Sequence, residues 1–294
     1  MFELNQVGEN TFYLQSPAKI GIWLASPNEA YLIDSGNDKD AGRRIRKILD
    51  ERGWTLRGIL NTHSNSDHIG GNAYLQSNTG CKIFSGGIEK SFTERTILEP
   101  SFLYGGFPCR ELRHKFLMAQ ESKPCGFNDP DFPKEIEVIP LPGHFFDMAG
   151  FRTPDDVVFL ADCLSGKPTL EKYGITFIYD VAEYLKTLEK VKSMTAKMFV
   201  PSHADPTDNI TELAQLNIDK VNEIAEKILG ICAEPTGFEQ ILKKLFDEYC
   251  LKMTFEQYVL VGSTVRSYLS WLYDTDRLSA DFSENIMLWR KSLR

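Results

Sequence analysis

The chain has 294 residues, of which 42% are hydrophobic and 25% charged, as in an ordinary globular protein of one large domain or of a domain with an appendage. Its formal net charge of -8 argues against a broad electrostatic surface for nucleic acid or anionic lipid, without excluding a local basic patch. No run of about 18 apolar residues is present, so no membrane span and no membrane partner are expected.

The sequence of the first part of the chain predicts a run of strands, followed by strands that alternate with helices. Four short apolar segments separated by turn residues predict an antiparallel meander that ends at Asp34; they are residues 2–7, 11–14, 20–24 and 30–33. Residues 38–52 carry apolar side chains at helical spacing, and Gly53 follows as a helix terminator. The strand over 57–61, the helix to about residue 76 and the strand over 81–84 indicate an α/β layered domain.

Residues 62–71 form the turn between the strand at 57–61 and the helix after it, and they carry several metal-binding residue types. His63 and Asn65 are two residues apart and can point the same way from an extended backbone. Asp67 and His68 stand where the helix begins, with Asn65 or Ser66 as its N-cap, and can face a second position beside the first.

Residues 86–133 interrupt this rhythm with a long segment rich in aromatic side chains. The aromatic residues either pack the insertion onto the core or wall a substrate pocket, and the sequence favours neither. A short helix is expected over residues 112–119. His114, between Arg113 and Lys115, is expected at the surface and not at a metal.

Three further strands deliver polar residues of the same types. A strand over 136–141 leads to His144, a hairpin of 150–152 and 157–160 leads to Asp162, and a strand over 198–200 leads to His203, after a helix over 181–194. Four of the five histidines therefore follow strands, which predicts a metal centre held by a rigid sheet. Cys163 should point away from it, because side chains alternate along a strand.

The last ninety residues change in character. Helices are predicted over residues 210–229, 238–249, 254–261 and 263–273, with a hairpin of 278–282 and 286–289 at the end. This order suggests a winged-helix-like region. Residues 236–294 contain eight Lys or Arg and eight Asp or Glu, so a role in packing or in homodimer formation is favoured over nucleic-acid binding.

Six cysteines are scattered without a CxxC pair, which favours free thiols over a disulfide framework. The first residues lack a basic and an apolar leader segment. Together these features predict a cytoplasmic protein.

The order of motifs resembles the metallo-β-lactamase superfamily over roughly residues 1–205: Asp34, then His63-x-Asn65-x-Asp67-His68, then His144, Asp162 and His203. The resemblance implies an αββα sandwich of two mixed sheets flanked by helices. The sandwich would form a catalytic domain over 1–205 with an insertion at about 86–133, followed by a mostly helical region over 206–294.

The resemblance also implies a ligand set for one or two zinc ions. His63, Asn65 and His144 would surround the first metal, Asp67, His68 and His203 the second, and Asp162 would bridge them. Asp67 would orient a metal-bound hydroxide and carry its proton, and Asp34 would hold a ligand histidine by its other ring nitrogen.

Asn65 departs from the family, which usually has histidine at this place. An amide oxygen is a weaker donor for zinc than an imidazole, so unequal occupancy of the two positions is expected. Asn65 could ligate through its oxygen and favour iron or manganese, the first position could be partly empty, or the site could be degenerate. We rank a working site first, because every other motif is intact.

These features favour a metal-dependent hydrolase of a small molecule, namely a thioester, a lactone or a related ester. A phosphodiesterase or nuclease is the alternative within the superfamily, and a non-catalytic metal-binding module is the alternative of another class. A flavin-partnered di-iron oxidoreductase and a true β-lactamase fit less well, since the chain lacks a flavodoxin-like segment and a periplasmic signal.

Overall fold

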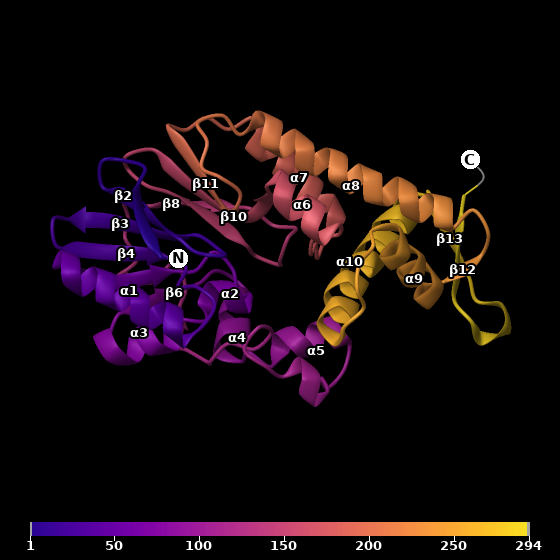
Figure 1. The fold of residues 1–294 in the computed structure, drawn as a ribbon, viewed down its shortest axis with the longest axis horizontal. Coiled ribbons are helices and arrows are strands. Elements are labelled where there is room, and N and C mark those ends of the chain that lie inside the picture. Colours follow the sequence, from indigo (N-terminus) through magenta and orange to yellow (C-terminus); the bar gives the residue numbers. More distant parts are fainter. Residues whose placement is uncertain (1, 293–294) are drawn as a thin grey trace.

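The fold is built on two β-sheets that face one another, as seen in a computed structural model that describes residues 2–292 (Figure 1). The larger sheet has seven strands in chain order: β1 (Glu3–Gln6), β2 (Thr11–Gln15), β3 (Ile20–Ser26), β4 (Glu29–Ile33), β5 (Thr55–Leu60), β6 (Lys82–Phe84) and β7 (Pro124–Cys125). Strands β1 to β4 pair antiparallel, which confirms the predicted meander, and β4 to β7 pair parallel.

The smaller sheet supplies the other half of the sandwich. Its order is β11 (Met198–His203), β10 (Val157–Ser165), β9 (Ala149–Arg152) and β8 (Glu137–Pro140). Only β10 and β11 pair parallel among these strands. Apolar side chains of both sheets, among them Trp23, Leu60, Phe84 and Phe159, form one buried cluster between the layers.

Helices cover the outer faces of both sheets. On the larger sheet lie α1 (Lys39–Arg52) and α3 (Asn72–Thr79), and on the smaller lie α7 (Val181–Lys192) and α8 (Thr211–Ile231). The carboxylate of Asp38 caps α1 by accepting from the amides of Asp40 and Ala41, and Gly53 ends the helix with φ 68°. The αββα sandwich predicted from the sequence is confirmed.

The insertion at residues 86–133 contains more structure than the sequence indicates. It forms α4 (Glu89–Glu94), α5 (Leu98–Tyr104), the 3-10 turn η1 (Arg110–Leu112) and strand β7. The helix predicted over 112–119 is wrong. Leu112 and Leu117 are both buried in one small cluster, and residues five apart cannot share one helix face, so the chain turns instead.

The C-terminal region contains β12 (Thr236–Gly237), α9 (Phe238–Glu248), α10 (Phe255–Asp274), β13 (Leu278–Asp281), η2 (Ser283–Asn285) and β14 (Leu288–Lys291). The strands form a small sheet in the order β12-β14-β13, which fits the predicted winged-helix shape. The third and fourth helices predicted here are one helix, α10. Gly262 does not break it, because that residue is buried against Phe238 and Leu242 of α9.

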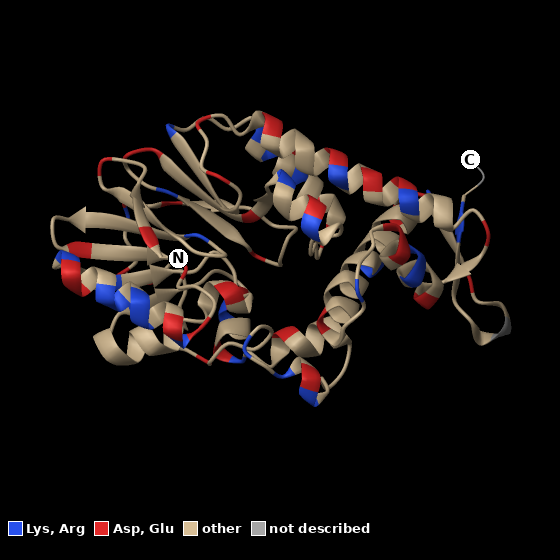
Figure 2. Cartoon of the chain, in the orientation of Figure 1, with Lys and Arg blue, Asp and Glu red and all other residues tan. Residues whose placement is uncertain are grey.

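The C-terminal region packs as a continuation of the smaller sheet's helical layer. One hydrophobic cluster runs from β10 through α7 and α8 to α9 and α10. Figure 2 shows positively and negatively charged residues interspersed along these helices. No helix in residues 2–292 is long and apolar enough to cross a membrane. The division of the chain at residue 205 stays a prediction.

Candidate metal centre

The turn after β5 is pressed against the loop that follows β4. A Cβ atom at Gly70 would lie 2.3 Å from the carbonyl carbon of Asn37, and one at Gly71 would lie 2.4 Å from the carbonyl oxygen of Ser35. Only glycine permits this approach. The helix predicted from residue 66 is divided here into α2 (Ser66–Ile69) and α3, with Asn65 at the N-cap position of α2.

The structure brings the predicted ligands together in two groups that share one residue. His63, His144 and Asp162 form the first, and Asp67, His68, Asp162 and His203 form the second. Within each group the ligand atoms lie within 4.8 Å of one another. Asp162 therefore lies where a residue between two cations would have to lie.

The spacing of these atoms fits bound cations. Asp162 Oδ1 lies 3.0 Å from His68 Nε2, and Asp162 Oδ2 lies 3.0 Å from His203 Nε2 and 3.7 Å from His144 Nε2. Ligands about 2.1 Å from a tetrahedral zinc ion are roughly 3.4 Å apart. Three of the converging atoms are buried and have no hydrogen-bond partner: His63 Nε2, His68 Nε2 and Asp162 Oδ1. Buried polar atoms without partners are costly, and cations bound by the two groups would satisfy all three.

Asp34 fixes the orientation of two of these histidines. Its Oδ2 accepts from His68 Nδ1 at 2.7 Å and from the hydroxyl of Thr62 at 2.7 Å. Since the Thr62 hydroxyl donates to Asp34, it accepts from His63 Nδ1, which lies 2.9 Å away. Both rings are therefore protonated at Nδ1 and present Nε2 to the centre. Thr62 was missed from the sequence, where nothing separates it from other strand-end hydroxyl residues.

Two local distortions of the backbone position the remaining ligands. The sequence predicts that the strand ends at Asp162. In the structure β10 continues to Ser165, so Asp162 lies within the strand. Ala161 has φ 51° and the pairing with β11 shifts there, so Asp162 is turned into the site from the middle of the strand. Gly143 has φ 119° and packs against the backbone of Tyr184, which sets the direction of His144.

The pKa values of the histidines reflect two opposing effects, burial and the nearby carboxylates. Burial lowers the pKa of His63 well below its usual value, with a further contribution from His68, and burial also lowers that of His144. Burial disfavours the charged form of His68 as well, but Asp162, Asp67 and Asp34 outweigh it and raise the pKa of that ring well above its usual value.

Burial and nearby charges also set the pKa values of His203 and Asp162. Burial opposes the charge of His203, yet Asp162 raises its pKa. Burial would likewise raise the pKa of Asp162, but His203 and His68 hold that carboxyl well below its ordinary range. A carboxylate that stays ionised while buried is suited to bind a cation.

Asn65 lies beside the first group and contacts a carboxylate that the sequence did not single out. Its Oδ1 is 3.3 Å from His144 Nε2, and its Nδ2 donates to Glu99 Oε1 at 2.8 Å. Glu89 is a second such carboxylate, and it accepts from the amides of Ser64 and Asp147. Burial raises the pKa of Glu89 to about 7 and that of Glu99 well above its usual value. No pattern in the insertion distinguishes these two glutamates from its surface acids.

A cavity of about 620 Å³ opens over the metal centre. Asp67, His144, Asp162 and His203 lie at its floor, and its walls are mostly apolar; they include Phe116, Leu117, Ile175, Phe177, Leu260 and Val261. Both roles considered for the insertion are present, since Phe116 and Leu117 wall this cavity while other aromatic residues pack on the core.

The two residues that the sequence places outside the centre lie outside both groups. His114 is half-buried and its Nε2 is 3.1 Å from Glu256 Oε1 at the start of α10. Cys163 is fully buried in the hydrophobic cluster of the smaller sheet and its helices, and burial raises the pKa of its thiol.

Known proteins resemble this chain in sequence and in structure. The "Beta-lactamase-like protein 2 homolog" of Drosophila melanogaster is 25% identical over 209 residues, which are 70% of this chain and 65% of that protein. The "Atrochrysone carboxyl ACP thioesterase" of Aspergillus fumigatus is 22% identical over 225 residues, which are 76% of this chain and 62% of that protein. The chain thus spans just under two thirds of the length of both relatives.

A solved structure shows that the fold extends to the C-terminal region. The crystal structure of a β-lactamase domain protein from Burkholderia ambifaria superposes with a TM-score of 0.73 at 16% identity, and covers 99% of this chain and 94% of its own. The sequence profile of the metallo-β-lactamase superfamily matches residues 22–203, which include every candidate ligand. The chain therefore belongs to the metallo-β-lactamase superfamily.

Proposed function

We propose that this protein is a metal-dependent hydrolase of a small-molecule thioester, lactone or related ester. The observation that carries the proposal is Asp162, which belongs to both groups of candidate ligands and lines a largely apolar cavity. His63, Asn65 and His144 would hold the first cation, and Asp67, His68 and His203 the second. Zinc suits this donor set of nitrogen and carboxylate oxygen, and iron or manganese are alternatives.

The chain's own residues supply binding, orientation and proton transfer. Bound metal ions in such sites make hydroxide available near neutral pH and polarise a substrate oxygen. Asp67 is the most exposed carboxylate of the centre, with 44% of its side chain accessible, and its Oδ2 lies 3.8 Å from His203 Nε2. It can therefore orient the attacking water and accept its proton. The apolar wall of Phe177, Leu260 and Val261 suits an acyl group and excludes water.

The thioester is the preferred substrate class because one relative that aligns with most of this chain is named a thioesterase. A nuclease receives no support from the charges, which are mixed in sign over the described C-terminal helices (Figure 2). Small-molecule hydrolysis in the cytoplasm agrees with the six cysteines, all of which are free thiols.

A homodimer formed through the C-terminal region is part of the proposal. Phe282, Ile286 and Met287 are exposed in the segment that joins β13 to β14, and exposed apolar side chains favour association. Sedimentation of the wild type and of Ile286→Glu would test it, and two monomeric proteins would refute it.

The experiment that tests the activity is a hydrolysis panel with metal-reconstituted protein. Thioesters, lactones, phosphodiesters and β-lactams are compared, with Asp67→Ala and the exposed variant Asp50→Asn as controls. Hydrolysis of an acyl substrate that Asp67→Ala abolishes and Asp50→Asn retains supports the proposal. Activity that survives Asp67→Ala, or activity on phosphodiesters alone, refutes it.

A further inference from the structure

Glu99 is a carboxylate buried at the edge of the metal centre, and it comes from helix α5 of the insertion. The residue is 5% exposed, and its Oε1 accepts a hydrogen bond of 2.8 Å from Asn65 Nδ2. Asn65 is the residue that replaces the histidine usual in the superfamily's second motif. A buried acid and the unusual residue of the site are therefore direct partners.

The contact with Glu99 decides which way the Asn65 amide faces. Glu99 Oε1 accepts from the amide nitrogen in the structure, and with an ionised Glu99 the opposite orientation would set two oxygens against each other. The Asn65 oxygen is therefore directed toward His144, with Oδ1 at 3.3 Å from Nε2. That separation resembles those among the other candidate ligands. Ionised or protonated, Glu99 keeps an oxygen that can accept this bond.

We propose that Glu99 is the positioning residue that makes Asn65 a ligand of the first metal position. The inference rests on the metal centre of the proposed function. Asp34 gives the pattern, since it holds His68 at Nδ1 and leaves Nε2 free for the centre. Glu99 does the same for an amide, because a hydrogen bond at Nδ2 fixes the side chain and makes Oδ1 more negative. A weak ligand is thereby made stronger by a partner outside the coordination sphere.

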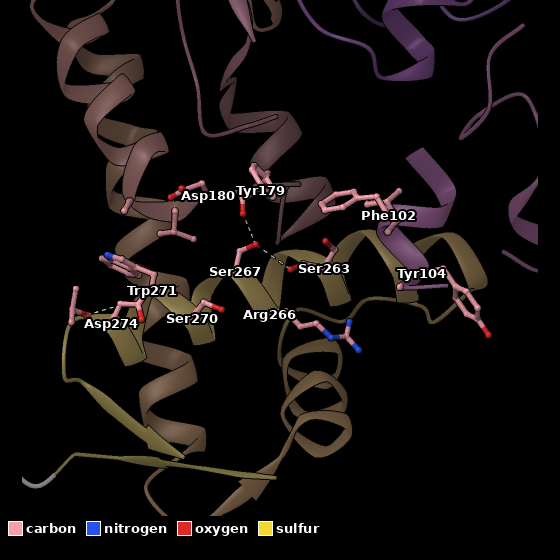
Figure 3. A pocket seen from close by; sticks show the side chains of 15 residues that line it. Phe102, Tyr104, Tyr179, Asp180, Ser263, Arg266, Ser267, Ser270, Trp271 and Asp274 are labelled. Atoms are coloured by element: carbon pink, nitrogen blue, oxygen red, sulfur yellow. Dashed lines mark hydrogen bonds between the residues drawn. The ribbon is translucent and has the colours of Figure 1, made fainter. Parts of the chain in front are cut away.

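The helix that carries Glu99 is held from two sides, as a positioning residue requires. On one side Phe102 packs against Phe145, next to His144, and against Tyr179. On the other side Leu103 shares a buried cluster with Val259 of α10. A cavity of about 800 Å³ lies beside this helix. Figure 3 shows its lining, in which Phe102 comes from α5 and Ser263 and Arg266 come from α10. The C-terminal region therefore supports the insertion at the point where the insertion reaches the metal centre.

The experiment measures metal affinity by competition with a chelator, using zinc and, for its visible spectrum, cobalt(II). Glu99→Ala should weaken the first position by about 10-fold or more, as losses of such partners do. Glu99→Gln keeps an acceptor oxygen and should restore most of the affinity. Glu94→Ala, on the neighbouring helix α4, is the matched control. Circular dichroism of each variant establishes that the protein is folded.

A double-mutant cycle separates positioning from other roles. Asn65→Ala should weaken the first position as much as Glu99→Ala does, and the double variant should be no weaker than Asn65→Ala alone. Additive losses would overturn the inference, because they would mean that Glu99 acts independently of Asn65, for example as a ligand. Unchanged metal affinity in Glu99→Ala would also overturn it. So would a wild-type protein that binds a single ion with an affinity that Glu99→Ala does not alter.

The failure of the metal centre itself gives a different result. Asp162→Ala removes the residue shared by both groups and should weaken both positions. Wild-type protein that binds no metal, or Asp162→Ala protein that binds it normally, refutes the proposed function together with this inference. If Asp162→Ala loses metal affinity as expected but Glu99→Ala binds metal like the wild type, the inference alone is refuted.

Discussion

Asp34 Oδ2 lies 2.7 Å from His68 Nδ1 at the centre of the larger sheet's carboxyl edge. Asp34 has φ 63°, a conformation that aspartate and asparagine tolerate better than most residues. The same oxygen receives the Thr62 hydroxyl, so one carboxylate orients rings from both candidate metal positions. The strained backbone conformation therefore occurs at the residue that orients both histidines.

Asp34→Asn should lower metal affinity while the fold is retained. Asparagine accepts the same backbone conformation, but it cannot accept from both His68 and Thr62 with a full negative charge. Loss of such a partner typically costs about 10- to 100-fold in metal affinity. Chelator competition measures the effect, with the exposed Asp50→Asn as control. Equal affinity in wild type and Asp34→Asn would show that Asp34 has no orienting role.

The sequence predicts the elements of the sandwich well, because alternating apolar residues and turn residues encode them locally. The ligand turn is predicted for the same reason, since His63, Asn65, Asp67 and His68 lie within six residues on one strand-to-helix connection. The convergence of His144 and His203 on that turn follows from the family resemblance, and periodicity alone does not show it.

The remaining features depend on contacts between distant segments. Glu99 reaches Asn65 from 34 residues away, through an insertion whose helices carry no clear amphipathic signal. Asp162 enters the site only because of a strand irregularity at Ala161, which the apolar run around it conceals. The turn after Leu112 is determined by packing against Val259, on a helix that begins more than a hundred residues later.

Asn65→His should raise metal affinity at the first position and bring the two positions closer in occupancy. Imidazole is a better donor for zinc than an amide oxygen, and a ring nitrogen could still donate to Glu99. Metal analysis after dialysis against a weak chelator measures the stoichiometry of the wild type and the variant. Unchanged stoichiometry and affinity would contradict the prediction.

Glu89 should make the stability of the metal-free protein fall as pH rises. Burial raises its pKa from 4.5 to about 7, so the folded protein holds a proton that the unfolded chain has lost between these values. Stability therefore declines across that window, by up to roughly 3 kcal/mol. In Glu89→Gln this contribution is absent, so the advantage of the wild type over the variant should shrink from pH 5 to pH 8.

Urea unfolding at several pH values measures that difference. Glu94→Gln, on the more exposed side of the same helix, should follow the pH dependence of the wild type. Parallel curves for wild type and Glu89→Gln would mean that the ionisation of Glu89 does not oppose folding.

Gly71→Ala and Gly230→Ala should change stability in opposite directions. The added methyl group at residue 71 would lie 2.4 Å from the carbonyl oxygen of Ser35, so the ligand turn must move and unfolding should become easier by about 1–3 kcal/mol. At residue 230, inside α8, no atom beyond the adjacent residues and the helix's own backbone lies within 4 Å of the new Cβ, and alanine should stabilise the helix by about 0.5–1 kcal/mol.

Metal affinity should fall only in Gly71→Ala, because Ser35 and Gly71 join the two loops that carry Asp34 and His68. Thermal unfolding with and without zinc measures both effects, and a Gly71→Ala protein as stable as the wild type would show that the two loops are not held by this contact.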